Sequence, residues 1–376
     1  MDLFIFIISS IVFLYSLMIL LFIAGFYKVP NETYKTDVAV NNFSIIVPFR
    51  NEESSLGMLI KSLNDIEYPR NKFEIIFVND NSDDNSLTLV NKLLKTTTLD
   101  YTILSLDSSL NGKKEALTFG ISKAKNPWIL TTDADCIVMP LWLKLFDQKL
   151  NDNDVKMLAG AVNFITNGSG FIEAFQTLDL SALIGTSIGS FGIGYPMMCN
   201  GANLLFSKDA FYEVSGYDGN IDIASGDDMF LMEKFKKHYP DKLGYLKARG
   251  AVVLTHSVSE IDEFINQRVR WAAKSSKYGS DYLKFISVLV GLANISLIIL
   301  FFLAIFGISL SKILPIILLK IFVNFWMIKI ASSFLDNKRK LYYYPIVSIL
   351  YPFYIIGISI LSQFSSFEWK GRIHKK

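Results

Sequence analysis

The stretch Phe43-Ser-Ile-Ile-Val-Pro-Phe-Arg-Asn-Glu-Glu53 joins a β-rich apolar run to a polar turn. Four further short apolar runs follow, separated by helical patterns, and they begin at Phe73, Tyr101, Trp128 and Lys156. Strands that are apolar almost throughout and alternate with amphipathic helices indicate a mostly parallel sheet covered on both faces. The sequence therefore predicts an α/β domain that binds its ligands at the carboxyl ends of the strands.

The composition adds membrane segments to this domain. Of the 376 residues, 51% are hydrophobic and 19% are charged, and the mean hydropathy is +0.34. This is too apolar for an ordinary soluble enzyme and too charged for membrane helices alone. The net charge of +2 gives no reason to expect a nucleic acid as a partner.

An uncharged run at the start of the chain predicts a membrane anchor. The run from Leu3 to Phe26 is long enough to cross a hydrocarbon layer of about 30 Å, so residues 1–28 are expected to form a transmembrane helix. Asp2 precedes the run and Lys28 follows it. Because cytoplasmic flanks carry the excess of positive charge, the chain after Lys28 is expected in the cytoplasm.

A C-terminal membrane region is predicted over residues 285–368, with two or three spans. It holds two uncharged runs and, between them, a third run with two lysines: 285–310, 341–367 and 313–335. These lysines, Lys320 and Lys329, either snorkel from a spanning helix or lie on the polar side of an interfacial one. A basic tail, residues 369–376, follows, and the charge pattern leaves its side of the membrane open.

Polar residues follow three of the predicted strands. They occupy residues 48–53, 79–84 and 133–135, and each stretch is expected to be a turn that opens a helix. Taken singly, such residues are ordinary helix caps, and Asp80 or Asp84 fits that interpretation. Since the carboxyl ends of parallel strands share one edge of a sheet, three such turns predict a polar crevice there.

Acidic pairs suggest what that crevice does. Asp133 and Asp135 stand one residue apart after a buried strand, where two carboxylates can bind a divalent cation and leave positions for phosphate oxygens. The stretch Gly226-Asp-Asp228 opens a further predicted helix, and acids there also compensate a helix dipole. The stretch Gln267-Arg-Val-Arg-Trp271, just before the membrane region, has an equally plain interpretation as an interfacial anchor.

Together and in this order, these stretches resemble the motifs of inverting family 2 glycosyltransferases of GT-A fold. The resemblance covers roughly residues 40 to 275, and it rests on Pro48 with Arg50-Asn-Glu-Glu53, Asp80 in its turn, Gly112-Lys113, Asp133-x-Asp135, Gly201-Ala-Asn203, Gly226-Asp-Asp228 and Gln267-x-x-Arg270-Trp271. The final Q-x-x-R-W motif beside membrane helices resembles the branch that contains ceramide glucosyltransferase and the hyaluronan, chitin and cellulose synthases. The resemblance implies a Rossmann-like GT-A catalytic domain over residues 40–280.

The resemblance also implies how a nucleotide-sugar donor is bound. Seven residues would contact a donor that is expected to be a UDP-sugar: Pro48, Arg50, Glu52, Asp80, Lys113, Asp133 and Arg270. Where the family usually has two adjacent acids after the second strand, this chain has Asn79-Asp80, so Asp80 would contact the base alone. Asp135, assisted by Asp133, would hold Mg²⁺ or Mn²⁺ against the diphosphate.

The remaining motifs are assigned to catalysis and to the acceptor. Asp228 is expected to be the general base for the acceptor hydroxyl, and Asp227 would orient it. Gln267 and Trp271 would lie on the acceptor side, sharing a helix face with Arg270 while Arg268 points away. The Gly- and Ser-rich stretch from Ala182 to Asn200 is either an acceptor-side loop or a buried connection.

The expected protein is an inverting glycosyltransferase of the cell inner or plasma membrane, with its catalytic domain in the cytoplasm. It would move a sugar to the hydroxyl of a membrane lipid or glycan acceptor. Two alternatives remain: a processive polysaccharide synthase, which needs enough membrane helices for a channel, and a catalytically inactive, nucleotide-sugar-binding membrane scaffold. The presence of both Asp135 and Asp228 favours an enzyme over the scaffold.

Overall fold

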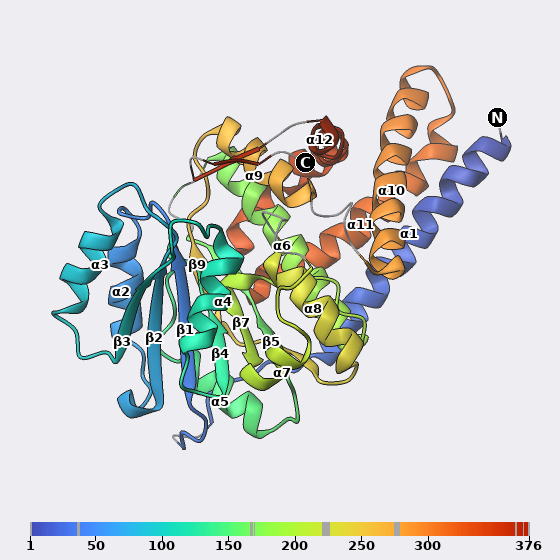
Figure 1. The fold of residues 1–376 in the computed structure, drawn as a ribbon. Coiled ribbons are helices and arrows are strands. Elements are labelled where there is room, and N and C mark those ends of the chain that lie inside the picture. The colour runs from blue at the N-terminus through green and yellow to red at the C-terminus, as the bar shows by residue number, and fades with distance from the viewer. Residues whose placement is uncertain are drawn as a thin grey trace. The chain divides into compact units, whose positions relative to one another are not determined.

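The computed structural model describes residues 2–35, 38–165, 168, 170–219, 226–273, 279–364, 367–370 and 372–374. The chain divides into two compact units. A sheet unit comprises Val29–Ile165 and Pro196–His256, and a helical unit comprises Met1–Lys28, Thr166–Tyr195 and Ser257–Lys376 (Figure 1). Residues 166–195 and 257–280, inside the range 40–280 predicted for the catalytic domain, thus pack with the helical unit.

The sheet unit alternates strands and helices along most of its length. Its strands are β1 (Phe43–Phe49), β2 (Phe73–Asn79), β3 (Tyr101–Ser105), β4 (Trp128–Thr131), β5 (Met157–Gly160), β6 (Val162–Phe164), β7 (Leu204–Ser207), β8 (Leu243–Leu246) and β9 (Val253–Thr255). Its helices are α2 (Leu56–Asn64), α3 (Ser86–Leu94), α4 (Lys113–Lys123), α5 (Trp142–Asn151), α7 (Lys208–Glu213) and α8 (Asp227–His238). The five strands expected from the sequence are all present, with bounds that differ by a residue or so.

Seven strands form one sheet in the order β3-β2-β1-β4-β7-β5-β8. The first four run parallel, β7 is antiparallel to both β4 and β5, and β8 is parallel to β5. Strands β6 and β9 form a separate parallel pair. The prediction of a mostly parallel α/β sheet is therefore confirmed.

Alternate residues of β1 explain why helices cover both faces. Phe43, Ile45 and Val47 belong to a core cluster that includes residues of α2, α3 and α5. Ile46 faces the opposite way, where α4 approaches so closely that a Cβ at Gly120 would lie 2.8 Å from its Cγ2. Because successive strand residues point to opposite faces, a run that is apolar at every position must be buried on both sides.

Pro48 occupies a central strand at a point where its missing N–H costs no ladder hydrogen bond. The pairing of β1 with β4 ends at Ile46, whose carbonyl accepts the N–H of Thr132 at 3.3 Å. The backbone of Pro48, two residues later, also faces the side of β4, but it lies beyond the last paired residues of the two strands. Proline is thus tolerated in β1 because one neighbouring strand has already ended.

The helical unit contains six long helices and a short terminal β pair within the described residues. The helices are α1 (Asp2–Lys28), α6 (Phe171–Gly192), α9 (Ile261–Ala273), α10 (Asp281–Ile305), α11 (Leu310–Phe334) and α12 (Tyr344–Phe364), and the strands are β10 (Phe367–Trp369) and β11 (Arg372–His374). The tail that was expected at 369–376 includes residues outside the described ones. The stretch from residue 182 to residue 192, which the sequence left as a loop or a buried connection, is the second half of α6.

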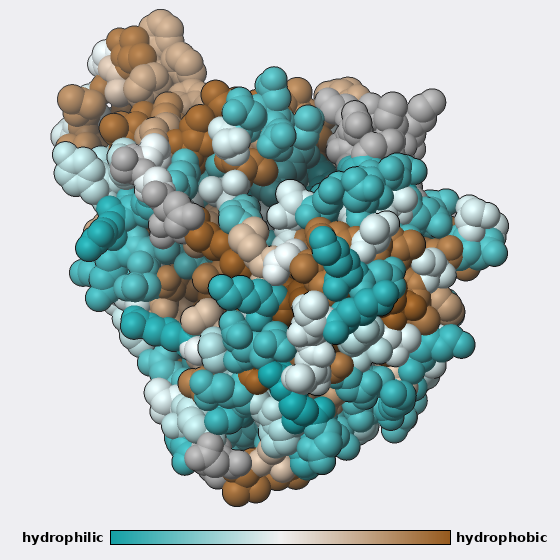
Figure 2. Space-filling view, turned by 90° about the vertical axis from the view of Figure 1, so that its left-hand side faces the viewer, coloured by the Kyte–Doolittle hydropathy of each residue, from teal (hydrophilic) through white to brown (hydrophobic). Residues whose placement is uncertain are grey.

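Four helices of the described chain are long and apolar enough to cross a membrane: α1, α10, α11 and the segment 338–364, which includes α12. Most of the large exposed hydrophobic side chains lie on these helices. Figure 2 shows the largest group of apolar side chains at the upper left of the face it presents, with smaller apolar patches among polar side chains elsewhere. Contiguous exposed apolar surface of this kind marks contact with lipid or with another protein.

The two lysines of α11 differ from each other. Lys329 is exposed, whereas Lys320 is only 2% exposed and lies inside the helical unit. Both interpretations of Lys320 from the sequence, a snorkelling side chain and a polar interfacial face, are therefore wrong. Hydropathy predicts that α11 is apolar. It does not predict where Lys320 points, because this depends on how the other helices pack around α11.

Helices α1 and α6 approach each other at glycines. A Cβ added at Gly189 of α6 would overlap the carbonyl oxygen of Phe22 on α1, and one added at Gly25 would overlap the carbonyl oxygen of Gly189. Small residues permit such backbone contact between helices in a membrane setting. The contact depends on the absence of side chains at these two positions.

We expect Gly189→Ala to destabilise the protein, because its methyl group has no space against α1. The cost of such overpacking is about 1–3 kcal/mol. Gly291→Ala on α10 is the matched control, since a Cβ there meets nothing within 4 Å. Thermal unfolding in detergent should show a lower Tm for G189A and an unchanged or slightly higher Tm for G291A. Equal Tm values for the two variants would contradict the close contact.

Candidate active site

The first two strands end in turns that are tied together. The N–H of Asp80, directly after β2, donates to the carbonyl of Phe49 at the end of β1 (2.9 Å). The guanidinium of Arg50 donates to the carbonyls of Asp80 (2.9 Å) and Asn81. Glu52 in the same turn donates its N–H to the Ser86 hydroxyl at 2.7 Å. Arg50 thus holds the two turns in register, in addition to any contact with a ligand.

Asp80 extends this network to the start of α4. Its side chain, 2% exposed, accepts the N–H of Gly112 at 2.9 Å. Gly112 has a φ of +106°, a backbone conformation that favours glycine, and it directly precedes α4. Asp84, in contrast, accepts the N–H of Ser86 at the start of α3 at 2.9 Å. The N-cap of α3 is Asn85, so the interpretation of Asp84 as the N-cap is wrong.

Lys113, the first residue of α4, lies between two carboxylates. Its Nζ is 2.5 Å from Asp133 Oδ1 and 3.6 Å from Asp227 Oδ2. Asp133 comes just after β4, and Asp227 is the first residue of α8. One ammonium group therefore joins three segments that are far apart in the sequence.

Asp228 completes this cluster. Its Oδ2 accepts the N–H of Gly201 at 3.1 Å, and its Oδ1 accepts the N–H of Met229 at 2.7 Å. The predicted helix start is confirmed, with Gly226 as the N-cap at a φ of +81°. A Cβ at Gly201 would lie 2.9 Å from Asp227 Oδ2 and 3.7 Å from Asp228 Cβ, so glycine is required for this close approach.

The charges in the cluster shift one another's pKa. Burial alone would lower the pKa of Lys113, but the carboxylates of Asp133, Asp227 and Asp228 outweigh burial and raise it. Burial raises the pKa of Asp133 despite the opposing effect of Lys113, and the charges of Asp135 and Asp227 raise it further. The site thus carries more negative charge than its lysine neutralises.

Asp135 lies beside Asp133 and contacts a residue of β9. Its Oδ2 is 3.4 Å from the hydroxyl of Thr255, which donates to it. Among the residues the structure describes, no three or more Asp, Glu, His or Cys side chains form a group that fits a metal ion. Two carboxylates with excess negative charge do fit a hard divalent cation of the Mg²⁺ type, which takes most of its ligands from phosphate and water.

The turn at 133–135 differs from the prediction in one respect. It does not open a helix, because α5 begins only at Trp142 and Ile137 forms a bridge with Leu254 in between. The other two turns do lead into α2 and α3. The bridge partner is more than a hundred residues away in the sequence, so local patterns could not reveal it.

The structure adds residues that the motifs did not single out. Thr255 bonds Asp135, and Cys199 Sγ lies 3.4 Å from the carbonyl of Asp228. Burial raises the pKa of Tyr217 well above its ordinary value, and the charges of Asp227 and Asp228 contribute. No local sequence signal marks these three residues, because each reaches the cluster through tertiary packing.

Asn203, the last residue of the stretch Gly201-Ala-Asn203, has a structural role. Its Nδ2 donates to the carbonyls of Ala161 and Ala251, both at 2.8 Å, and its Oδ1 accepts the indole N–H of Trp142 at 2.9 Å. The side chain is fully buried. It therefore supports the loop that carries Gly201.

The residues expected on the acceptor side lie in the helical unit. Gln267, Arg270 and Trp271 are on α9 and each is partly buried. Within the described residues, the buried Oε1 of Gln267 has no hydrogen-bond partner. An unsatisfied buried acceptor of this kind suits a ligand or water.

The expectation that Arg268 points away from this group is wrong. Arg268 is 3% exposed, its guanidinium lies 4.3 Å from the ring centroid of Trp271, and its Nη2 is 3.2 Å from Asp179 Oδ2 on α6. The contact is an ion pair without good hydrogen-bond alignment. Asp179 also accepts the hydroxyl of Tyr351 at 3.1 Å. Helical spacing places Arg268 beside Trp271, and α6 supplies the charge that draws it inward.

Comparison with known proteins shows which family the domain resembles. Residues 44–214 match the model of the family Glycosyl transferase family 2. A Sulfolobus acidocaldarius protein described as a "probable glycosyltransferase" is 26% identical over 257 residues, 65% of this chain and 52% of that protein. Poly-beta-1,6-N-acetyl-D-glucosamine synthase of Staphylococcus epidermidis is 27% identical over 243 residues, 62% of this chain and 54% of the synthase. The chain thus spans about half the length of these relatives.

A solved structure has the same fold. Mannosyltransferase PcManGT from Pyrobaculum calidifontis, in complex with GDP-Man and Mn²⁺, superposes with a TM-score of 0.59 at 16% identity, over 93% of this chain and 99% of that one. The chain thus shares the mostly parallel α/β sheet of the GT-A fold with this structure. Residues 44–214 are thus similar to glycosyltransferase family 2.

The buried pair between Arg268 and Asp179 predicts a coupled loss of stability. We expect Arg268→Met to leave Asp179 as an unpaired buried charge, at a cost of about 3 kcal/mol. Asp179→Asn in the same chain should restore part of the Tm, because it removes that charge. Arg270→Met, on the same helix, is the control and should lower the Tm less. Additive effects of the Arg268 and Asp179 substitutions in thermal unfolding would argue against the pair.

Proposed function

We propose that the protein is a membrane-bound, inverting glycosyltransferase that moves a sugar from a nucleotide-sugar to a hydroxyl of a membrane lipid or glycan. The observation that carries the proposal is the charged cluster of Lys113, Asp133, Asp135, Asp227 and Asp228 at the carboxyl end of the sheet. The family 2 domain and the four apolar helices support it.

Asp135 and Asp133 would hold the cation, Mg²⁺ or Mn²⁺, which would neutralise the charge of the leaving diphosphate.

Pro48, near the end of β1, and Asp80, directly after β2, would lie on the side of the nucleotide base. Arg50 and Glu52 would support them there. Lys113 lies 2.5 Å from Asp133 and would reach a phosphate oxygen near it. A UDP-sugar remains the proposed donor. PcManGT binds GDP-Man, so that donor belongs in the same assay.

Asp228 suits the general base better than Asp227. Asp227 is engaged by Lys113, whereas two backbone N–H groups hold the Asp228 carboxylate in a fixed orientation. A carboxylate held in this way is oriented to take the proton of an attacking hydroxyl. Attack opposite the departing nucleotide inverts the anomeric carbon, by the logic that separates one-step from two-step glycosyl transfer.

The acceptor would be recognised through α9. Arg270 would add positive charge to the leaving diphosphate, and Trp271 and Gln267 would contact the acceptor.

The Arg270→Lys variant should then lose most of its activity at a nearly normal Tm, because lysine cannot reproduce the guanidinium fork. Full activity of this variant would remove Arg270 from the proposal.

One observation favours a second candidate. A relative is a synthase of poly-beta-1,6-N-acetyl-D-glucosamine, so processive synthesis of a polysaccharide remains the alternative. A growing chain needs a channel, and the described residues offer four candidate spans. An inactive scaffold is the less favoured third reading, because the acids of the cluster are present. The length of the product formed from a UDP-N-acetylglucosamine donor separates single transfer from polymerisation.

The general base is tested by Asp228→Asn. We expect turnover to fall at least about 10²-fold with donor affinity unchanged, because the substitution removes the proton acceptor and keeps the shape. Asp209→Asn is the matched control, since Asp209 also lies in the first turn of a helix, α7, but is exposed. The measurement is nucleoside diphosphate release with a panel of UDP-sugars and GDP-Man over membrane lipid extracts. Wild-type turnover of D228N would exclude Asp228.

The cation site is tested by Asp135→Ala. Titration of UDP with and without Mn²⁺ should show that the metal strengthens binding to the wild type and not to D135A. Asp152→Ala, at the exposed C-cap of α5, should behave as the wild type. Undiminished Mn²⁺ dependence in D135A would place the ion elsewhere.

We place the sheet unit in the cytoplasm, because Lys28 follows α1 and nucleotide-sugars are cytoplasmic substrates. A cysteine at the exposed Asn151, in a chain without Cys136 and Cys199, should resist a membrane-impermeant maleimide applied to intact cells. It should react once the cells are opened. Efficient labelling of intact cells would overturn this orientation.

A further inference from the structure

The buried lysine of α11 has no carboxylate partner. Among the described residues, the polar contact of Lys320 Nζ is with Asn294 Oδ1 on α10, at 3.0 Å, and the ammonium lies 5.0 Å from the ring centroid of Tyr15 on α1. An ionisable side chain in the interior of a membrane bundle is costly and usually serves a function. Because neither of these groups is anionic, an anionic ligand would be needed to neutralise a charge on Lys320.

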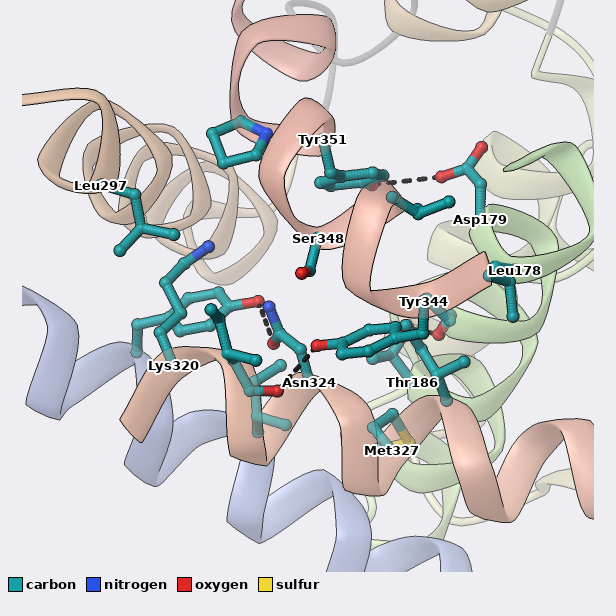
Figure 3. A pocket seen from close by; sticks show the side chains of 17 residues that line it. Leu178, Asp179, Thr186, Leu297, Lys320, Asn324, Met327, Tyr344, Ser348 and Tyr351 are labelled. Carbon is teal, nitrogen blue, oxygen red and sulfur yellow. Dashed lines mark hydrogen bonds between the residues drawn. The ribbon is translucent and has the colours of Figure 1, made fainter. Parts of the chain in front are cut away.

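Lys320 lines a cavity of about 90 Å³ within the helical unit. Residues of α1, α6, α10, α11 and α12 enclose it, and Figure 3 shows Lys320, Asn324 and Ser348 directed toward the same space. The volume is several times the roughly 10–15 Å³ that one water molecule requires. There is room for a small polar group as well as water.

The polar atoms around the cavity favour an anion. Asn324 Oδ1 accepts the hydroxyl of Tyr15 at 2.9 Å, while its Nδ2 donates to no described residue. Lys320 uses one of its three N–H donors on Asn294. Two donor groups, one of them cationic, therefore remain on adjacent turns of α11.

The acid that lines the same cavity is already engaged. Asp179 pairs with Arg268 at 3.2 Å and accepts the hydroxyl of Tyr351 at 3.1 Å. It has no ion pair with Lys320. The rest of the lining is largely apolar, with side chains such as Ile19, Leu178 and Leu297.

We propose that this cavity binds the phosphate group of a membrane lipid. The two donors of α11 match phosphate oxygens, and a charge-assisted hydrogen bond of this kind is stronger in the interior of a protein than in water. The unit that contains the cavity is built from the candidate spans, so lipid chains are the apolar surroundings it would meet. The proposal concerns the helical unit alone and does not depend on which sugar or acceptor the enzyme uses.

The test is thermal unfolding of the full chain in detergent with three additives: dioleoyl phosphatidic acid, dioleoylglycerol and inorganic phosphate. We expect phosphatidic acid to raise the Tm saturably by about 3 °C or more, because a ligand that binds only the folded state stabilises it. Dioleoylglycerol has the same chains without phosphate and should not raise the Tm. If both lipids act equally, or if inorganic phosphate alone gives the full shift, the lipid-phosphate site is overturned.

Substitutions then locate the site. Lys320→Met should abolish the shift with phosphatidic acid, and Lys329→Met, at an exposed position of the same helix, should retain it. Asn324→Leu is a second variant that removes the other donor and should reduce the shift. Native mass spectrometry of the same preparations should find bound phosphatidic acid on the wild type and K329M. A full shift in both K320M and N324L would overturn the assignment to this cavity.

Discussion

The ion pairs of Lys113 are the interaction on which the arrangement of the site depends. One ammonium group joins Asp133 after β4 with Asp227 at the start of α8, and Lys113 itself begins α4. The pairs are partly buried, so their attraction is less screened than that of a surface pair. Since Asp80 holds Gly112 at the same helix start, the ends of β2 and β4 and the beginning of α8 are fixed by neighbouring contacts. The parallel sheet brings the carboxyl ends of β2 and β4 to one edge, and the contacts of Lys113 and Asp80 fix how far these segments lie from each other and from the start of α8.

An excess of acid is the second property of the site. Burial, with the charges of Asp135 and Asp227, raises the pKa of Asp133. The charges of Asp133, Asp227 and Asp228 raise the pKa of Lys113 in spite of its burial. Such an arrangement is costly without a cation, because like charges are held close in a partly dry place. The proposed divalent ion would offset the charge of these acids, and a diphosphate would supply further oxygen ligands for it.

The helical unit handles its buried charges in two ways. Arg268 and Asp179 neutralise each other and also contact aromatic rings, so this pair serves the packing of α9 against α6. Lys320, in contrast, contacts the side-chain amide of Asn294 and the ring face of Tyr15 rather than an acid. In the first arrangement two opposite charges lie together, whereas the second leaves Lys320 beside a cavity without an acid as its partner. That difference separates a structural pair from a site that can receive an anion.

The sequence by itself determined the first five strands, the mostly parallel α/β class, the long apolar helices and the acids at the strand ends. These properties are local: apolar runs set burial, and polar turns follow where strands stop. It also showed a resemblance to one family, through the order of its motifs along the chain. Tertiary structure alone decided that Lys113 bridges Asp133 and Asp227, that Thr255, Tyr217 and Cys199 join the cluster, and that Arg268 and Lys320 turn inward. Each of these depends on partners distant in the sequence, and the direction of a side chain follows from the charge and space that those partners provide.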